Sequence, residues 1–181
     1  MSLQKTLSNV LTTSCCLALI AVAGLAACDS ASSVNHRSPR AQFGQDRNAT
    51  ALNALGEPVA LAQFSDKFVW VDYAAEWCSS CKPQSNTIRS LASSAPERVV
   101  FVTVMTSEPE AYGHPATQET AARWAKRLSL DPKRVVAADL TSLQLPQHAL
   151  FSPDGRERYR RIGKMSAVEI RRVIAAEVQK P

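Results

Sequence analysis

The 181-residue chain has little of what marks fibrous or low-complexity proteins. Its six Gly and ten Pro are too few for a collagenous chain, and its 45% hydrophobic content excludes disorder along the whole length. Its 21 Lys and Arg are scattered among 16 acidic residues, without the continuous basic stripe of a nucleic-acid-binding protein. We therefore expect one globular domain with extensions, and no nucleic-acid partner.

The chain also lacks an apolar run of the roughly 20 residues that a transmembrane helix needs. Its first 28 residues carry one charged side chain, Lys5, and an apolar run from Cys15 to Ala27 leads into the sequence LAAC at residues 25–28. This arrangement is typical of an export signal. A retained membrane anchor is the alternative.

The sequence LAAC resembles the bacterial lipobox, in which the signal is cut before a cysteine that then carries lipid. The resemblance implies a lipoprotein signal peptide over residues 1–27 and a mature chain that begins at acylated Cys28 and is tethered to a membrane. Residues 28–49 contain few large apolar side chains and predict a flexible tether, which leaves residues 50–181 for the folded domain. Asp29 follows the cysteine, as in enteric lipoproteins retained at the inner membrane.

Cysteine is scarce, and only one pair remains for chemistry. Once Cys15 and Cys16 leave with the signal and Cys28 carries lipid, Cys78 and Cys81 remain at C-x-x-C spacing. A disulfide across two intervening residues closes too small a loop to stabilise a fold appreciably. The value of this pair is therefore chemical rather than structural, and an exported location permits its oxidation.

Hydrophobic patterning predicts an α/β order of elements that ends in a hairpin and a helix. Strands are expected at residues 68–75, 99–105, 135–138, 148–151 and 156–162. Helices are expected from the C-x-x-C pair to residue 92, over 117–130, and from a capping box at Ser166 and Glu169 to residue 178. The sequence SPDG at 152–155 predicts the turn of the hairpin.

Residues 71–82, VDYAAEWCSSCK, resemble the thioredoxin pattern VDFxAEWCxxCK almost residue for residue. Farther along, Leu145 and Pro146 followed by a strand, a turn and Gly163 match the cis-proline strand, hairpin and late glycine of that family. Residues 56–67 look like the lead-in of its membrane-tethered, TlpA-like branch. The resemblance implies a thioredoxin fold, with a central mixed β-sheet flanked by helices, and a redox-active disulfide.

The sequence departs from thioredoxin at several points near the pair. Ser79 and Ser80 replace the Gly-Pro of thioredoxin, and this dipeptide strongly influences the reduction potential. An aromatic residue is replaced by Ala74, and Pro83 follows the motif unusually soon. The lysine that thioredoxin carries on its next strand has no counterpart in residues 99–105. These departures bear on the direction of electron flow.

The placement of the pair before a helix predicts the role of each cysteine. A cysteine at the first turn of a helix meets free backbone N–H groups and the positive end of the helix dipole, which favour the thiolate. We expect Cys78 there as the nucleophile, and Cys81 as the thiol that resolves the mixed disulfide. An inert disulfide is one alternative. A zinc site is another, but it would need four ligands, and His36, His114 and His148 are not grouped at zinc spacing.

Asp72 lies in the middle of an apolar strand, where an ionised carboxylate is costly unless it is paired. We therefore expect a raised pKa for Asp72, and the resemblance implies that this carboxyl relays a proton to Cys81. A position at a strand end in contact with solvent is the alternative. The resemblance also implies that Pro146 is a cis-proline facing the disulfide, with the backbone of Leu145 free to pair with a substrate chain.

Three further side chains are expected around the pair. Trp77 is predicted to cover the rim of the site while contributing to the core, and Glu76 and Lys82 are predicted to be solvated charges that tune the local field.

The sequence as a whole predicts a membrane-tethered thiol–disulfide oxidoreductase that faces the periplasm and reduces the cysteines of other exported proteins. It would use no dissociable cofactor and no metal, and an integral-membrane thiol protein would supply its electrons. The alternative function is a copper-binding assembly factor that uses Cys78, Cys81 and His148, because His148 lies two residues after Pro146.

We predict that Cys28 is acylated. Mass spectrometry of the N-terminal peptide of the mature protein should find Cys28 as its first residue, carrying lipid, because the lipobox pattern ends there. The Cys28→Ser variant is the control and should lose membrane association. An unmodified Cys28, or cleavage at another position, would contradict the tether.

Overall fold

The computed structural model of the chain describes residues 43–44, 46–107, 114–140 and 143–180. These residues all belong to one compact unit, Arg37–Pro181. The predicted signal peptide, Cys28, His36 and most of the predicted tether lie outside the described residues.

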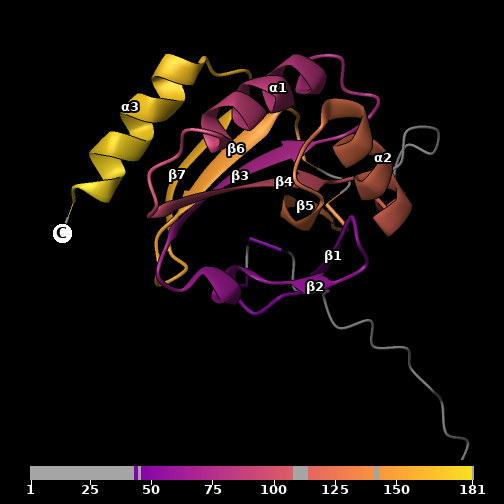
Figure 1. The fold of residues 1–181 in the computed structure, drawn as a ribbon, viewed down its shortest axis with the longest axis horizontal. Helices are drawn as coiled ribbons and strands as arrows, with labels where there is room; N and C mark the ends of the chain where they lie inside the picture. Colours follow the sequence, from indigo (N-terminus) through magenta and orange to yellow (C-terminus); the bar gives the residue numbers. More distant parts are fainter. Residues whose placement is uncertain (1–42, 45, 108–113, 141–142, 181) are drawn as a thin grey trace, which may run out of the picture. The chain divides into compact units, whose positions relative to one another are not determined.

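Seven strands of the described chain form one sheet in the order β2-β1-β5-β4-β3-β6-β7 (Figure 1). The strands are β1 (Ala51–Asn53), β2 (Pro58–Val59), β3 (Phe68–Ala74), β4 (Val99–Met105), β5 (Val135–Ala137), β6 (Gln147–Phe151) and β7 (Glu157–Ile162). The helices are α1 (Cys81–Ala92), α2 (Gln118–Leu128) and α3 (Ala167–Val178), with short 3₁₀ turns η1 (Leu61–Phe64) and η2 (Pro132–Arg134).

The sheet is mixed, as predicted. Strands β3, β4 and β5 are parallel, whereas β6 and β7 continue the sheet antiparallel on one side and β1 and β2 on the other. All seven residues of β3 are buried, which is expected of a parallel strand covered on both faces. The strand that leads to the cysteines is therefore an interior strand that is enclosed along its whole length.

Alternating residues of β3 point to the two faces of the sheet. Trp70 and Ala74 lie in the clusters formed with α1, α2 and α3, and Figure 1 shows these three helices on one side of the sheet. Val71 and Tyr73 face the opposite side, where η1 and Phe43 cover the sheet. Because Phe43 is buried, core packing begins inside the segment that was expected to be tether.

The elements predicted by periodicity are present, with small differences at their ends. The capping box of Ser166 and Glu169 begins α3, and Ser129 in the left-handed conformation ends α2 two residues before the predicted boundary. Strands β1 and β2 are not predicted from the sequence, because two or three residues are too few to show an alternating pattern. Among the described helices, none combines the length and hydropathy of a membrane span.

Helix α1 is aligned with the segment before α3 by one buried side chain. The Gln84 amide donates to the carbonyl oxygen of Met165 (3.1 Å), and its Oε1 accepts from the N–H of Met165 (2.8 Å). Gln84 thus satisfies two buried backbone groups that have no strand partner. The contact fixes α1, and with it Cys81, relative to the sheet.

We predict that Gln84→Met destabilises the protein by about 3 kcal/mol, because the N–H and carbonyl of Met165 would be left buried without partners. The free energy of unfolding in urea measures the effect. The matched control is Gln63→Met at an exposed position, which should change stability by less than about 0.5 kcal/mol. Equal effects of the two substitutions would show that the Gln84 contacts contribute nothing specific.

Candidate active site

Cys78 and Cys81 form a disulfide between the end of β3 and the start of α1, with Cα atoms 5.3 Å apart. Cys81 is fully buried, whereas 7% of the surface of Cys78 remains exposed. An incoming thiol or disulfide can therefore reach Cys78 but not Cys81. This asymmetry supports the predicted assignment of Cys78 as nucleophile and Cys81 as resolving thiol.

The position of the helix relative to the pair differs from the expectation. Helix α1 begins at Cys81, so Cys78 lies in the turn before the helix and not in its first turn. The reason is a tight backbone turn, in which the N–H of Cys81 donates to the carbonyl of Cys78 (3.0 Å). The disulfide nevertheless holds the Cys78 sulfur at the N-terminus of α1, where the helix dipole favours negative charge.

The carboxyl of Asp72 lies on the helix face of the sheet and is fully buried. Its Oδ2 accepts a hydrogen bond from the hydroxyl of Ser85 (2.8 Å). Ser85 is four residues after Cys81 on α1, and residues at this spacing occupy the same face of a helix. The carboxyl therefore lies one helical turn from Cys81, and the solvent-exposed alternative for Asp72 is wrong.

Burial raises the pKa of Asp72 to about 7, and the hydrogen bond from Ser85 offsets only part of this effect. The raised pKa agrees with the expectation for a carboxyl inside an apolar strand. Near neutral pH the group can therefore both accept and release a proton.

His148 on β6 is the register partner of Asp72 on β3. Its Nδ1 lies 3.3 Å from Oδ1 of Asp72, and both side chains are enclosed. Burial lowers the pKa of His148 to about 4, the backbone of Gly163 opposes this, and the charge of Arg161 adds to it. The imidazole is therefore neutral at pH 7.

From the sequence, His148 is expected to be a strand residue or, in the alternative function, a copper ligand. The structure pairs it with Asp72 instead, and in the described part of the chain no three His, Cys, Asp or Glu side chains are grouped so that they could hold a metal. The proposed set of Cys78, Cys81 and His148 is thus not assembled. The contact between His148 and Asp72 depends on the register of β3 against β6, which sequence patterning does not reveal.

The peptide bond between Leu145 and Pro146 is cis, as the resemblance implies. Leu145 packs against the hydrophobic cluster that contains both cysteines, and the carbonyl of Pro146 accepts from the N–H of Gly163 (2.8 Å). These contacts place the start of β6 at the same end of the sheet as the disulfide.

Trp77 lies directly before Cys78 and is 41% exposed. Its indole N–H donates to the hydroxyl of Ser107 (2.8 Å), which holds the ring at the surface beside the pair. Lys82 is exposed, as predicted. These two residues therefore offer contact surface around the disulfide.

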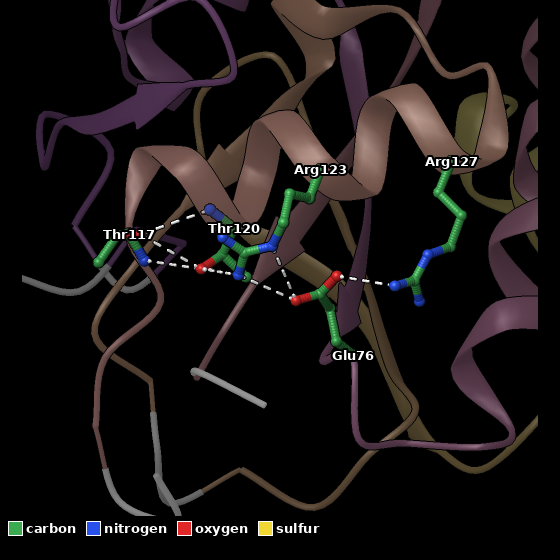
Figure 2. A network of polar contacts seen from close by, with 5 residues as sticks. All are labelled: Glu76, Thr117, Thr120, Arg123 and Arg127. Atoms are coloured by element: carbon green, nitrogen blue, oxygen red, sulfur yellow. Dashed lines mark hydrogen bonds and ion pairs between the residues drawn. The ribbon is translucent and has the colours of Figure 1, made fainter. Parts of the chain in front are cut away.

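Glu76 was expected to be solvated, and this expectation is wrong. Only 5% of its side chain is exposed, because Arg123 (3.0 Å) and Arg127 (3.3 Å) of α2 each form an ion pair with one carboxylate oxygen. Figure 2 shows the carboxylate between the two guanidinium groups, with Arg123 also reaching Thr120. The arginines are four residues apart, so a single face of α2 holds the loop before Cys78.

Residues 58–117 match the thioredoxin family model. No curated protein matches the chain. The match includes β3, the disulfide and α1. Together with the strand order and the Cys78–Cys81 disulfide, it confirms the thioredoxin fold and defines the class as thioredoxin-fold thiol–disulfide oxidoreductases.

Solved structures show the same fold at low sequence identity. The exposed lipoprotein thioredoxin of Streptococcus pneumoniae is 20% identical, with a TM-score of 0.56 over 70% of this chain and 97% of that one. A secreted disulfide oxidoreductase of Mycobacterium tuberculosis is 18% identical, with a TM-score of 0.53 over 70% and 94%. StoA from Bacillus subtilis is 18% identical, with a TM-score of 0.53 over 68% and 93%.

Asp72 and His148 should act in opposite directions on the pH dependence of stability. Because burial raises the pKa of Asp72 from 3.8 to about 7, the folded chain retains a proton that the unfolded chain releases, and the free energy of unfolding falls as pH rises through this range. Because burial lowers the pKa of His148 from 6.5 to about 4, the unfolded chain takes up a proton that the folded chain does not. The contribution of His148 to the free energy of unfolding therefore falls as pH decreases from 6.5 to 4.

We predict that Asp72→Asn in the oxidised protein gains stability relative to the wild type as pH rises from 4 to 8, by about 4 kcal/mol. Urea unfolding at half-unit pH steps measures this difference. The exposed Asp66→Asn is the control, and its difference from the wild type should stay within about 0.5 kcal/mol. A difference for Asp72→Asn that does not change with pH would contradict the raised pKa.

Proposed function

We propose that this chain is a membrane-tethered thiol–disulfide oxidoreductase of the bacterial envelope that reduces disulfides in exported proteins. The observation that carries the proposal is the asymmetric pair itself. Cys78 keeps access to solvent, whereas Cys81 is enclosed one helical turn from a buried carboxyl. This is the arrangement that a nucleophilic thiol followed by a resolving thiol requires.

In the reduced protein, the Cys78 thiolate attacks one sulfur of the substrate disulfide. A mixed disulfide forms, and the other substrate sulfur leaves as a thiolate. Cys81 then loses its proton to the carboxylate of Asp72 and attacks the Cys78 sulfur, which breaks the mixed disulfide and closes Cys78–Cys81. Two electrons pass to the substrate, and its two thiolates take protons from water.

Asp72 suits the role of proton acceptor because of where it lies. A buried thiol such as Cys81 has no water to take its proton, and an isolated thiolate in an apolar environment is costly. The nearby carboxyl has a pKa of about 7 and is therefore partly ionised at neutral pH. A base with this pKa accepts a proton near pH 7 and returns it when the pair is reduced again.

The buried carboxyl also favours a reducing over an oxidising role. A strong oxidant has an unusually stable reduced form, in which the nucleophilic thiolate is stabilised by neighbouring groups. Asp72, when ionised, disfavours a second negative charge nearby. The flanks Ala75–Trp77 and Lys82, and an apolar residue before Pro146, resemble those of thioredoxin and support the same direction.

The membrane tether and the electron donor are proposed from the N-terminal sequence and from the chemistry. The lipobox-like sequence ending at Cys28 supports lipid anchoring at the inner membrane, and one structural relative is described as an exposed lipoprotein. Each turnover leaves the protein oxidised, so a source of electrons is needed. A thiol protein embedded in the same membrane fits this need, and exported proteins with cysteines are the substrates.

We predict that the protein rests in the dithiol form in cells, with a reduction potential near the −270 mV that is typical of thioredoxin. Thiol alkylation in intact cells reports the resting state, and equilibration with glutathione gives the potential. Loss of the membrane donor should oxidise Cys78. A resting disulfide, or a potential near about −120 mV, would reverse the direction of electron flow.

A second experiment traps the substrates as mixed disulfides. Cys81→Ser should accumulate mixed disulfides between Cys78 and exported proteins, because the resolving step is removed. Cys78→Ser is the matched control and should trap none. If the Cys81→Ser variant also traps none, the thiol exchange activity itself would be in doubt.

A further inference from the structure

The hydroxyl of Ser85 has a different kind of partner from two other hydroxyls of α1. Thr87 and Ser90 each donate to the carbonyl four residues earlier on the same helix, at 3.2 Å and 3.1 Å, and both bonds are exposed. This is a common arrangement for a serine or threonine inside a helix. Ser85 is fully buried and donates instead to Oδ2 of Asp72 on β3, at 2.8 Å. The contact therefore joins α1 to the strand that leads to the cysteines.

Among the described residues, Ser85 is the one hydrogen-bond donor to the Asp72 carboxyl. Oδ1 is buried without a hydrogen-bond partner. An ionised carboxylate can accept about four hydrogen bonds, so this one is poorly supplied. Because a buried charge is costly unless it is paired or hydrogen-bonded, the ionised form depends strongly on the single donor that it has.

The other side chains that face Asp72 in the described structure bring no opposite charge. Register places Thr103 of β4 on one side of it and His148 of β6 on the other. His148 lies 3.3 Å away without a hydrogen bond, and burial lowers its pKa to about 4, so the imidazole is neutral at pH 7. Beyond it, Arg161 of β7 forms an ion pair with Glu169. The donor on α1 is therefore the neighbour that favours the ionised carboxylate.

We propose that Ser85 is a positioning residue for the resolving step: its hydroxyl holds Oδ2 of Asp72 toward α1 and stabilises the carboxylate that takes the proton of Cys81. This inference rests on the proposed function, since it concerns the proton acceptor of that step. Ser85 and Cys81 are four residues apart and share the buried face of α1. The donor and the thiol are thus presented to the carboxyl by the same helix face.

The proton balance of the step leaves Ser85 unchanged. The S–H bond of Cys81 breaks, and an O–H bond forms on the Asp72 carboxyl. The Cys81 sulfur bonds to the Cys78 sulfur, and the substrate sulfur leaves as a thiolate. The Ser85 hydroxyl keeps its own proton and donates more strongly to a carboxylate than to a neutral acid. It therefore favours the state of Asp72 that accepts a proton, without transferring one itself.

The test removes this hydroxyl with the smallest change in packing. Ser85→Ala deletes one buried oxygen atom, and alanine suits a helix interior. Ser90→Ala is the matched control, because it deletes an exposed hydroxyl from the same helix. The probe is oxidised glutathione, which forms a mixed disulfide with Cys78 that Cys81 then resolves, releasing glutathione. Rapid acid quenching and mass spectrometry from pH 5 to 9 follow both steps.

We predict that Ser85→Ala moves the midpoint of the resolving step upward by about one pH unit, because the buried carboxylate loses its donor. Since the pKa of Asp72 is about 7 in the wild type, resolution at pH 7 should slow about fivefold. Near pH 9 the two rates should converge, and the first step should be unchanged throughout. Ser90→Ala should follow the wild type. Resolution that slows equally at every pH would point to altered packing and would rule out the proposed role.

Two further measurements separate the possible failures. In an Asp72→Asn background, Ser85→Ala should leave the pH profile of resolution unmoved, and a shift that persists there contradicts the role of Ser85. Carbon NMR of the Asp72 carboxyl in the oxidised protein should show its titration midpoint moving upward in Ser85→Ala, and an unmoved midpoint contradicts that role as well. If the wild type fails to form or resolve the mixed disulfide, the proposed function itself fails. That outcome is distinct from a wild type that reacts while Ser85→Ala has no effect, which overturns only the role of Ser85.

Discussion

The enclosed carboxyl of Asp72 is the constraint on which the site depends. β3 is buried along its whole length, so a charged side chain in its middle has no access to water and must be satisfied by its neighbours. Ser85 donates a hydrogen bond to Oδ2, whereas Oδ1 lies 3.3 Å from Nδ1 of His148 without a hydrogen bond, so the charged form is only partly compensated. The geometry of α1 and β6 around the disulfide is therefore coupled to the protonation of a single group.

This constraint requires that α1 and the loop before it be held firmly. Gln84 joins α1 to the segment before α3 through two buried hydrogen bonds, and Glu76 joins the loop to α2 through two ion pairs. Between these two anchors lie Trp77, the cysteine pair with its two serines, Lys82 and Pro83. The scaffold thus keeps Cys78 at the surface while Cys81 stays enclosed.

The absence of a lysine on β4 has a structural consequence. The residue of β4 in register with Asp72 is Thr103, which brings no charge to the carboxyl. On the opposite side of β3, His148 supplies a neutral ring whose pKa is lowered by burial. Among the described residues the buried acid therefore has no ionised partner at neutral pH, so nothing of opposite charge offsets the burial that raises its pKa.

The sequence by itself determined the thioredoxin fold, the redox pair and the buried position of Asp72, because these are local patterns: an apolar strand, a C-x-x-C spacing and a helix that follows. It did not reveal that Glu76 is enclosed by Arg123 and Arg127, or that His148 meets Asp72. The first contact depends on where α2 packs, and the second on the register between β3 and β6. Such contacts join residues 47 to 76 positions apart, and only the tertiary structure decides them because no local pattern records which faces will meet.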